Sequence, residues 1–368
     1  MKKILTVLGA RPQVIKSAAI TRVVLSEFSN QLEEVVVNTG QHYDSNMNAD
    51  FFEELLLPIP KYNYSIDGNQ PFPISQMIAC IEKAVAIENP DLILVYGDTN
   101  STLAGAIGAV KNEIPLVHVE AGLRSFNLDM PEEGNRILTD HSSQLLFSPT
   151  LEGVSNLKKE ALDDSFIFHC GDVMYDNSIY YLEKARGTST ILKDFDLLKD
   201  GYLLLTCHRP SNTDSKESLS EIFVALRKLS KKTGKKVVFP IHPRTKKQIL
   251  TFFGEEYLKV ELGDFLLLPP TSFLDTIMLI SNADFIITDS GGIQKEAYFF
   301  RKKSLVLRDE TEWVEIVTND AAILVGSDSD RIINGYDKIK FLIPTFPSLF
   351  GDGKAGHFIC KTILKEFG

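Results

Sequence analysis

One short segment of the chain combines residue types that hold anions and hydroxyl groups. Asp289-Ser290-Gly291-Gly292 follows an apolar run, and Glu296 lies four residues beyond Gly292. Two glycines let an anion approach the backbone, and the N–H groups at the start of a helix can hold a phosphate. A carboxylate on the same face of that helix could accept two hydroxyl groups, as from a ribose. The alternative is an ordinary tight turn followed by a solvated glutamate.

Three acids follow expected strands or open a helix in the N-terminal half. Asp98 and Glu120 come after apolar runs, and Glu132 follows a proline at a helix start. Each has a structural alternative: Asp98 could cap a helix unless one of the next three residues does so, Arg124 could pair with Glu120, and helices favour acids in their first turn. Clustered carboxylates raise one another's pKa and can supply an acid and a base together.

Cations and histidines occupy similar positions. Arg11 and Lys16 open a helix after the first apolar run, while His208-Arg209 and His242-Pro243-Arg244 follow two runs of the C-terminal half. We expect Arg11 and Lys16 to point toward a phosphate, and the two histidine segments to form a cationic or hydrogen-bonding wall. The alternative is that they are exposed surface cations.

Alternating apolar runs and amphipathic stretches predict the elements that position these residues. The apolar runs are β-branched and lack strict alternation, which is typical of parallel strands covered on both faces. Helical spacing is present in the intervening stretches, including 74–87, 101–110, 219–232 and 292–300. Repeated βα units predict an α/β fold with doubly wound sheets. The expected strands are 4–8, 34–38, 91–96, 116–120, 145–148 and 166–169 in a first series, and 202–206, 236–240, 265–268, 284–288, 304–307 and 322–325 in a second.

Two series of strands predict two domains. We expect an N-terminal domain over residues 1–171 and a C-terminal domain over 172–354, with a last helix at about 355–368 returning to the first. Ligands of open parallel sheets bind outside the carboxyl ends of the strands, so two facing sheets would surround one interdomain cleft.

Composition excludes several classes of protein. The 368 residues carry 39 basic and 49 acidic side chains, a net charge of −10, which disfavours a nucleic-acid binder. Four dispersed cysteines support neither disulfides nor a zinc site. No apolar run is long enough to span a membrane, so we expect a cytoplasmic protein. The segment 351–356 matches G-x-G-x-x-G but follows no expected strand, and we interpret it as the turn into the last helix.

The motifs, taken in order over almost the whole chain, resemble the non-hydrolysing UDP-N-acetylglucosamine 2-epimerase family. The resemblance implies two Rossmann-like domains arranged as in GT-B glycosyltransferases, with the nucleotide bound mainly by the second. It also implies a homodimer that needs no NAD, other cofactor or metal. The motifs that carry it are Gly9-Ala10-Arg11-Pro12 with Lys16, Gly40-Gln41-His42, Gly97-Asp98-Thr99, His118 to Arg124, Pro131-Glu132-Glu133 with Asn135-Arg136, His208-Arg209, and Asp289 to Gly292 with Glu296.

The reaction implied is the interconversion of UDP-N-acetylglucosamine and UDP-N-acetylmannosamine. UDP is eliminated to give 2-acetamidoglucal and then adds back, after C2 has received its proton on the other face. The resemblance assigns the acid and base roles to Asp98, Glu120 and Glu132 without distinguishing them. It assigns the diphosphate to Arg11, Lys16, His208 and the Ser290, Gly291 and Gly292 backbone, the ribose to Glu296, and uracil stacking to Phe273.

Some features leave alternatives open. Family members with a second, regulatory UDP-sugar site would use Gln41, His42, Arg209 and His242, but Ser211 stands where the family often has a glutamate. Segments 172–176, 295–300 and 308–313 look more like the branch that epimerises modified substrates, such as UDP-2,3-diacetamido-glucuronic acid or 6-deoxy aminosugars. A GT-B glycosyltransferase, a hydrolysing epimerase and a non-catalytic nucleotide-sugar sensor are the other candidates.

Overall fold

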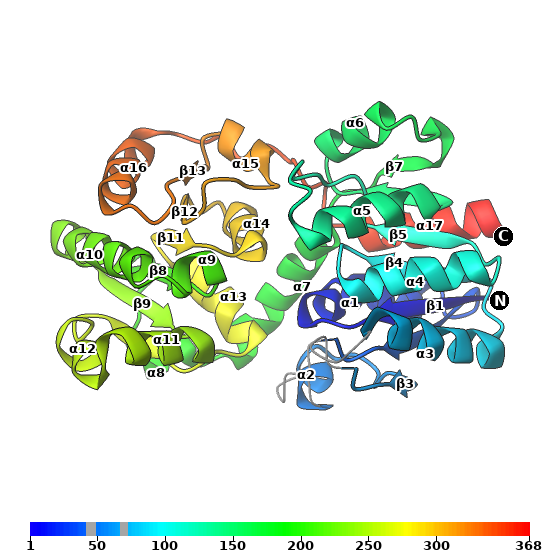
Figure 1. Cartoon of the computed structure of the whole chain (residues 1–368), viewed down its shortest axis with the longest axis horizontal. Helices are drawn as coiled ribbons and strands as arrows, with labels where there is room; N and C mark the ends of the chain where they lie inside the picture. Colours follow the sequence, from blue (N-terminus) through cyan, green and yellow to red (C-terminus); the bar gives the residue numbers. More distant parts are fainter. Residues whose placement is uncertain (42–48, 67–72) are drawn as a thin grey trace. The chain divides into compact units, whose positions relative to one another are not determined.

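The computed structural model describes residues 1–41, 49–66 and 73–368. The chain divides into a first unit, Met1–Ile179 with Ser348–Gly368, and a second unit, Tyr180–Pro347. Each unit is a parallel sheet with helices on both faces, as Figure 1 shows. The predicted α/β class with two doubly wound sheets is therefore confirmed.

The first unit contains a seven-stranded sheet in the order β3-β2-β1-β4-β5-β6-β7. All six strands predicted for this half are present. The short strand β3 was not predicted, because two residues carry no periodic signal. The strands are β1 (Lys2–Leu8), β2 (Leu32–Asn38), β3 (Tyr62–Asn63), β4 (Leu92–Tyr96), β5 (Leu116–Val119), β6 (Leu145–Ser148) and β7 (Ile167–His169).

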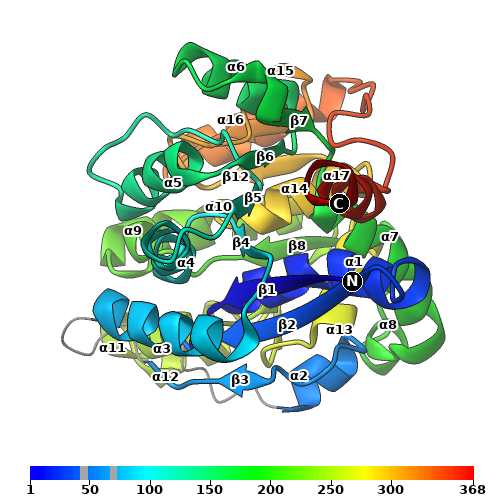
Figure 2. The same cartoon turned by 90° about the vertical axis from the view of Figure 1, so that its right-hand side faces the viewer.

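The helices of this unit lie on the two faces of its sheet, as Figure 2 shows. α3 and α4 pack side by side on one face with α5 next to α4, and α17 packs against α1 on the other. The helices are α1 (Arg11–Glu27), α2 (Ala49–Glu54), α3 (Pro73–Glu88), α4 (Asn100–Lys111), α5 (Pro131–Ser142), α6 (Leu151–Lys159), the 3-10 helix Asp164–Phe166, the first part of α7 (Val173–Thr188) and α17 (Ala355–Phe367).

The second unit contains a six-stranded sheet in the order β10-β9-β8-β11-β12-β13, and all six predicted strands are present. The strands are β8 (Tyr202–Thr206), β9 (Lys236–Pro240), β10 (Leu266–Leu268), β11 (Phe285–Thr288), β12 (Ser304–Val306) and β13 (Ala322–Leu324). The helices are α8 (Ile191–Asp194), α9 (Pro210–Thr213), α10 (Lys216–Thr233), α11 (Pro243–Phe253), α12 (Glu255–Val260), α13 (Phe273–Asn282), α14 (Gly291–Phe299), α15 (Val314–Thr318) and α16 (Ser329–Phe341).

Burial explains why the strands lack alternation. Every residue of β4 is buried, as are all of β5, β11 and β12. Side chains on both faces of these strands pack against helices, so both faces are apolar. Only the ends of such strands can present polar groups without burying them unpaired.

The last helix lies in the first unit. Asp176 of α7 accepts hydrogen bonds from the backbone N–H groups of Ala355 (3.1 Å) and Gly356 (2.8 Å) at the start of α17. In α7, Asn177 Nδ2 donates to the Ile15 carbonyl at 2.6 Å. These bonds place residues 172–179 and 348–354 with the first unit, whereas the sequence assigned them to the second.

The G-x-G-x-x-G segment forms the turn into α17, with φ of +85° at Gly351 and +82° at Gly353. It is not a phosphate loop between a strand and a helix. In the part of the chain that the structure describes, no helix is long and apolar enough to cross a membrane.

Candidate active site

A cation and a carboxylate meet at the carboxyl ends of β4 and β5. Lys16 Nζ of α1 forms an ion pair with Glu120 Oε2 directly after β5. A Cβ atom added to Gly97, directly after β4, would lie 3.2 Å from Lys16 Nζ and 3.3 Å from Glu120 Oε2. Both side chains are largely buried, with 16% and 7% exposed. The pair therefore lies against the residue that precedes Asp98, where a φ of +63° favours glycine.

The suggested pairing of Glu120 with Arg124 is wrong. Arg124 Nη1 lies 2.8 Å from Asp140 Oδ2, and its Nε and Nη2 donate to Glu160 at 2.6 and 2.8 Å. Asp140 is fully buried on α5, and an ionised carboxylate there requires cationic and N–H partners. Burial alone would raise the pKa of Asp140, but His118 and Arg124 lower it overall.

Asp98 is not a helix cap. Thr99 caps α4 instead, and its Oγ1 accepts the Thr102 N–H at 3.3 Å. Arg136 of α5 donates to Asp98 Oδ2 from Nε (2.9 Å) and Nη2 (2.6 Å), and Asn135 Nδ2 donates to the Asp98 carbonyl at 2.9 Å. The Asp98 side chain remains 28% exposed. Asp98 is thus an oriented, partly exposed carboxylate that directly follows Gly97, the residue against which the Lys16–Glu120 pair lies.

The two glutamates at the start of α5 differ in environment. Glu132 is exposed in the first helical turn. Glu133 is buried and accepts hydrogen bonds from the N–H groups of Ser125 and Phe126, both at 2.9 Å, and from Arg136 at 2.8 Å. Burial raises the pKa of Glu133, but these hydrogen bonds lower it overall. The structure thus places Asp98 and Glu120 after the neighbouring strands β4 and β5 and leaves Glu132 exposed.

A buried glutamine that sequence reasoning missed organises the turn after β1. Gln13 Oε1 accepts the N–H groups of Gly9 (2.9 Å) and Ala10 (3.1 Å), while its Nε2 donates to the Tyr96 carbonyl at 2.8 Å. A side chain at Gly9 would collide with Ser101 Oγ. Gln13 therefore fixes the helix start that carries Arg11, and its place as the third residue of α1 was the available sequence signal.

Two other predicted residues of the first unit are in contact with their neighbours. The Arg11 guanidinium lies 4.6 Å from the ring centroid of Phe51, in a cation–π contact. Gln41 Oε1 accepts hydrogen bonds from Ser101 N (2.9 Å) and Oγ (2.8 Å), and so binds the N-terminus of α4. His42 lies outside the described residues.

A buried aspartate of the predicted Asp289-to-Gly292 motif, to which no role was assigned, joins the two candidate loops of the second unit. Asp289 Oδ2 accepts the backbone N–H groups of His208 and Arg209, both at 2.9 Å, and Asn212 Nδ2 at 3.2 Å. Its Oδ1 lies 3.2 Å from His208 Nδ1. Burial raises the pKa of Asp289, but His208 and the two backbone N–H groups lower it overall. Asp289 thus orients His208, whose side chain is 43% exposed.

The Ser-Gly-Gly turn has the predicted strand–turn–helix geometry. Ser290 caps α14, and its Oγ accepts the Ile293 N–H at 3.4 Å. Gly291 is half-buried, Gly292 is exposed and Glu296 is buried. A side chain at Gly291 would collide with Oε1 of Glu312. The other carboxylate oxygen of Glu312, Oε2, lies 2.9 Å from Arg308 Nη1. The Arg308–Glu312 pair beside this turn was not predicted as part of the site.

The other predicted residues of the second unit give a mixed result. His242 is exposed, caps α11, and has its ring centroid 6.0 Å from that of His208. Arg209 is half-buried in the same loop. Phe273 does not present an open stacking face: it is 5% exposed, and its ring lies edge-on to Tyr181 at 5.3 Å. Its apolar ring completes the packing of α13 against α7.

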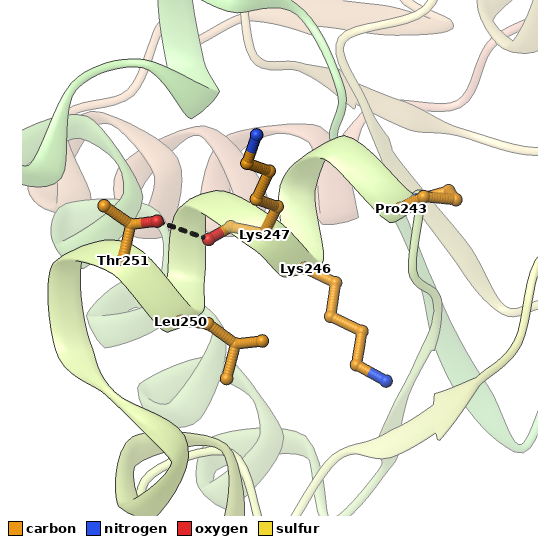
Figure 3. Close-up of a pocket in the computed structure, with 5 residues that line it drawn as sticks. All are labelled: Pro243, Lys246, Lys247, Leu250 and Thr251. Atoms are coloured by element: carbon orange, nitrogen blue, oxygen red, sulfur yellow. Dashed lines mark hydrogen bonds between the residues drawn. The ribbon is translucent and has the colours of Figure 1, made fainter.

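A separate surface pocket of about 450 Å³ holds none of the predicted residues. It is lined by Pro243, Lys246, Lys247, Leu250 and Thr251 of α11, which Figure 3 shows. Across the described ranges, no three histidine, cysteine or acidic side chains are grouped to hold a metal ion.

Comparison with solved structures identifies the class. A crystal structure of the Methanocaldococcus jannaschii UDP-GlcNAc 2-epimerase, in complex with UDP-GlcNAc and UDP, is similar to this chain with a TM-score of 0.89 and 38% identity. The similarity covers 99% of this chain and 100% of that one. The fold is therefore the two-domain α/β fold of the GT-B type.

The sequence model described as UDP-N-acetylglucosamine 2-epimerase matches residues 26–364. A Methanococcus maripaludis protein, called a UDP-N-acetylglucosamine 2-epimerase homolog, is 44% identical over 98% of this chain and 99% of its own length. The Pseudomonas aeruginosa UDP-2,3-diacetamido-2,3-dideoxy-D-glucuronate 2-epimerase is 40% identical over 99% of both chains. The chain belongs to the UDP-N-acetylglucosamine 2-epimerase family.

Proposed function

We propose that this chain interconverts UDP-N-acetylglucosamine and UDP-N-acetylmannosamine by epimerisation at C2. The observation that carries the proposal is the Lys16–Glu120 ion pair next to Gly97-Asp98, in a chain of this family. The structural relative with UDP-GlcNAc and UDP bound supports the choice of substrate.

The chemistry requires that the sugar leave its nucleotide. C2 of the sugar is not adjacent to a carbonyl, so its proton is barely acidic. Once the bond between C1 and the UDP oxygen breaks, C1 is electron-poor and the C2 proton can leave to a base. The products are UDP and 2-acetamidoglucal. Addition of a proton to the opposite face of C2 and of UDP to C1 gives the epimer, with no net oxidation or hydrolysis.

The first unit would supply the proton transfers. Asp98 and Glu120 follow the neighbouring strands β4 and β5, and they differ in environment. Glu120 is paired with a lysine and Asp98 with an arginine, so each carboxylate has a fixed orientation. Glu132 stays in the proposed set as an exposed acid that a bound substrate could cover.

The nucleotide would be bound mainly by the second unit. His208 and the Ser290–Gly292 turn offer an imidazole and helix N–H groups for the diphosphate, and Glu296 would accept the ribose hydroxyls. Arg11 and Lys16 would add positive charge as the leaving group forms. The case for a second, regulatory UDP-sugar site is weaker, because the side chain of Gln41 already binds the N-terminus of α4.

The second candidate substrate is UDP-2,3-diacetamido-2,3-dideoxy-D-glucuronate, which the 40% identical Pseudomonas aeruginosa relative favours. Steady-state kinetics with both UDP-sugars decide between them. The proposal predicts a higher kcat/KM for UDP-N-acetylglucosamine, and a preference of more than about tenfold for the other sugar would overturn it. Quantitative release of free sugar and UDP would instead identify a hydrolysing enzyme.

The proposal includes a cytoplasmic homodimer. All four cysteines are free thiols, which suits a reducing compartment. Light scattering of the purified protein at micromolar concentration should give twice the mass of the chain, and a monomer mass would contradict the dimer.

A further inference from the structure

A buried network of charged side chains, with Asp140 of α5 at its centre, joins the two loops that carry Asp98 and Glu120. His118 of β5 and Asp140 of α5 are both 0% exposed, and Arg124 is 6% exposed. Asp140 Oδ1 lies 2.7 Å from His118 Nδ1, while its Oδ2 accepts the Gly122 N–H at 3.1 Å and lies 2.8 Å from Arg124 Nη1. None of these side chains is needed in the reaction described above.

The partners of His118 define its protonation. Its Nε2 lies 2.8 Å from the Gly97 carbonyl oxygen, which can only accept a hydrogen bond. Its Nδ1 faces an ionised carboxylate, which also only accepts. Hydrogen bonds to both acceptors would require protons on both ring nitrogens, which is the imidazolium form. Other charged groups nearby are Arg124 beside Asp140, Glu160 beside Arg124, and the Lys16–Glu120 pair, which lies against Gly97.

The network spans the reacting groups without touching them. Through Nε2, His118 holds the carbonyl of the residue before Asp98. Through Asp140, it holds the N–H two residues after Glu120. Glu120 itself has a φ of +75°, a left-handed conformation that a glutamate keeps only when its surroundings fix it. Stability alone does not explain the buried His118–Asp140 pair, since well-packed apolar residues in its place would stabilise the fold as well.

We propose that His118, held as an imidazolium by Asp140, is a positioning residue that sets the distance and orientation between Asp98 and Glu120 for C2 proton transfer. The catalytic effect of this positioning rests on the proposed function. The charge state of His118 does not depend on that function.

Nitrogen NMR of the wild-type protein, labelled at its histidines, tests the charge state. Among the seven histidines, His118 is recognised by ring N–H protons that are protected from exchange. We expect both of its ring nitrogens to carry protons at neutral pH, because each faces a hydrogen-bond acceptor. A His118 ring with one unprotonated nitrogen at neutral pH would overturn the proposal, and this result does not depend on any variant or activity.

Two substitutions separate the two hydrogen bonds. The amide nitrogen of His118→Gln can reach the Nε2 position and keep the bond to Gly97, whereas that of His118→Asn can reach the Nδ1 position and keep only the bond to Asp140. We expect kcat to fall about 100-fold in H118N and about tenfold in H118Q, because small misplacements of reacting groups are costly. KM should stay within about threefold, since substrate contacts are unchanged.

The matched control is Tyr202→Phe, which removes another buried hydrogen bond, from Tyr202 Oη to the Leu279 carbonyl at 2.6 Å, at the start of β8. It should lower the Tm and leave kcat per UDP-binding site unchanged. If H118N and H118Q both keep kcat within about twofold of wild type, His118 does not position the site. If neither variant folds, the NMR result decides. If the wild-type protein is inactive but His118 is an imidazolium, the proposed function is wrong and the charge state inferred for His118 still holds.

Discussion

Glu120, a candidate acid or base, has a strained backbone conformation. Its positive φ costs about 1–3 kcal/mol for a residue with a side chain. The N–H groups of Glu120 and Ala121 both donate to the Phe147 carbonyl, at 2.9 and 3.0 Å, and this pins the turn. The result is that the carboxylate meets Lys16 instead of the more distant Arg124.

The first prediction concerns Asp98 and Glu120. Asp98→Asn and Glu120→Gln should each lower kcat by at least about 100-fold, because a positioned acid or base contributes about that much. UDP affinity, measured by calorimetry, should stay within about tenfold. Glu152→Gln, an exposed acid of α6, is the control and should behave as wild type. A parallel collapse of UDP binding in both site variants would show that the two acids are structural.

The second prediction separates the two glutamates of α5. Glu133→Gln should lower the free energy of unfolding by about 1–3 kcal/mol, because Glu133 is buried and accepts two backbone N–H groups. Glu132→Gln should leave unfolding unchanged and lower turnover. Urea denaturation and initial rates of both variants test this. Wild-type turnover in E132Q would remove Glu132 from the acid and base set.

The sequence predicted the site to different degrees. Asp98, Glu120, His208 and the Ser290–Gly292 turn follow strands directly, so their place at the strand ends could be inferred, whereas Lys16 lies within α1. The partners of these residues could not be, because Asp140, Asp289 and Gln13 act through side chains that only the folded packing brings near. Phe273 was misjudged because sequence gives no measure of how far a ring is buried.

At the scale of elements, strands were easier to predict than boundaries. Apolar, β-branched runs between helices identified twelve of the strands, because burial on both faces leaves a strong signal. The two-residue strand β3 (Tyr62–Asn63) is defined only by its pairing with β2. The helix α5 proved to be the hub of the first unit's site, since Glu133, Asn135, Arg136 and Asp140 all hold site loops from it.

The third prediction tests the attachment of the last helix. Asp176→Ala removes the carboxylate that accepts the N–H groups of Ala355 and Gly356. The free energy of unfolding should fall by about 0.5–2 kcal/mol, the range for loss of a helix cap. Lys361→Ala, exposed on the same helix, should change it by less than about 0.5 kcal/mol. Equal effects of the two substitutions in urea denaturation would contradict this role of Asp176.

At the scale of the whole molecule, two units share one chain that leaves the first and returns to it. The sequence predicted this organisation, because two series of strands precede an amphipathic last helix. It did not predict that the division falls within α7, since the side chains of Asp176 and Asn177 attach the first half of that helix to the first unit.

The fourth prediction concerns acid stability. Glu88 at the end of α3 lies 2.7 Å from Lys61 Nζ and accepts the Tyr62 hydroxyl at 2.6 Å, and these contacts lower its pKa from 4.5 to about 2. A folded-state pKa below the unfolded one adds stability that is present above about pH 4.5 and is lost as the pH falls toward about 2. The difference in unfolding free energy between wild type and Glu88→Gln should therefore shrink over that range. A difference that stays constant with pH would contradict the ion pair's role.

The most direct measurement is proton NMR of UDP-N-acetylglucosamine incubated with the wild-type enzyme in deuterated water. Departure of the C2 proton during turnover predicts that deuterium appears at C2 of both UDP-sugars as UDP-N-acetylmannosamine accumulates. Epimer that forms with its C2 proton retained, or a UDP-sugar that shows neither exchange nor epimer, would contradict the account.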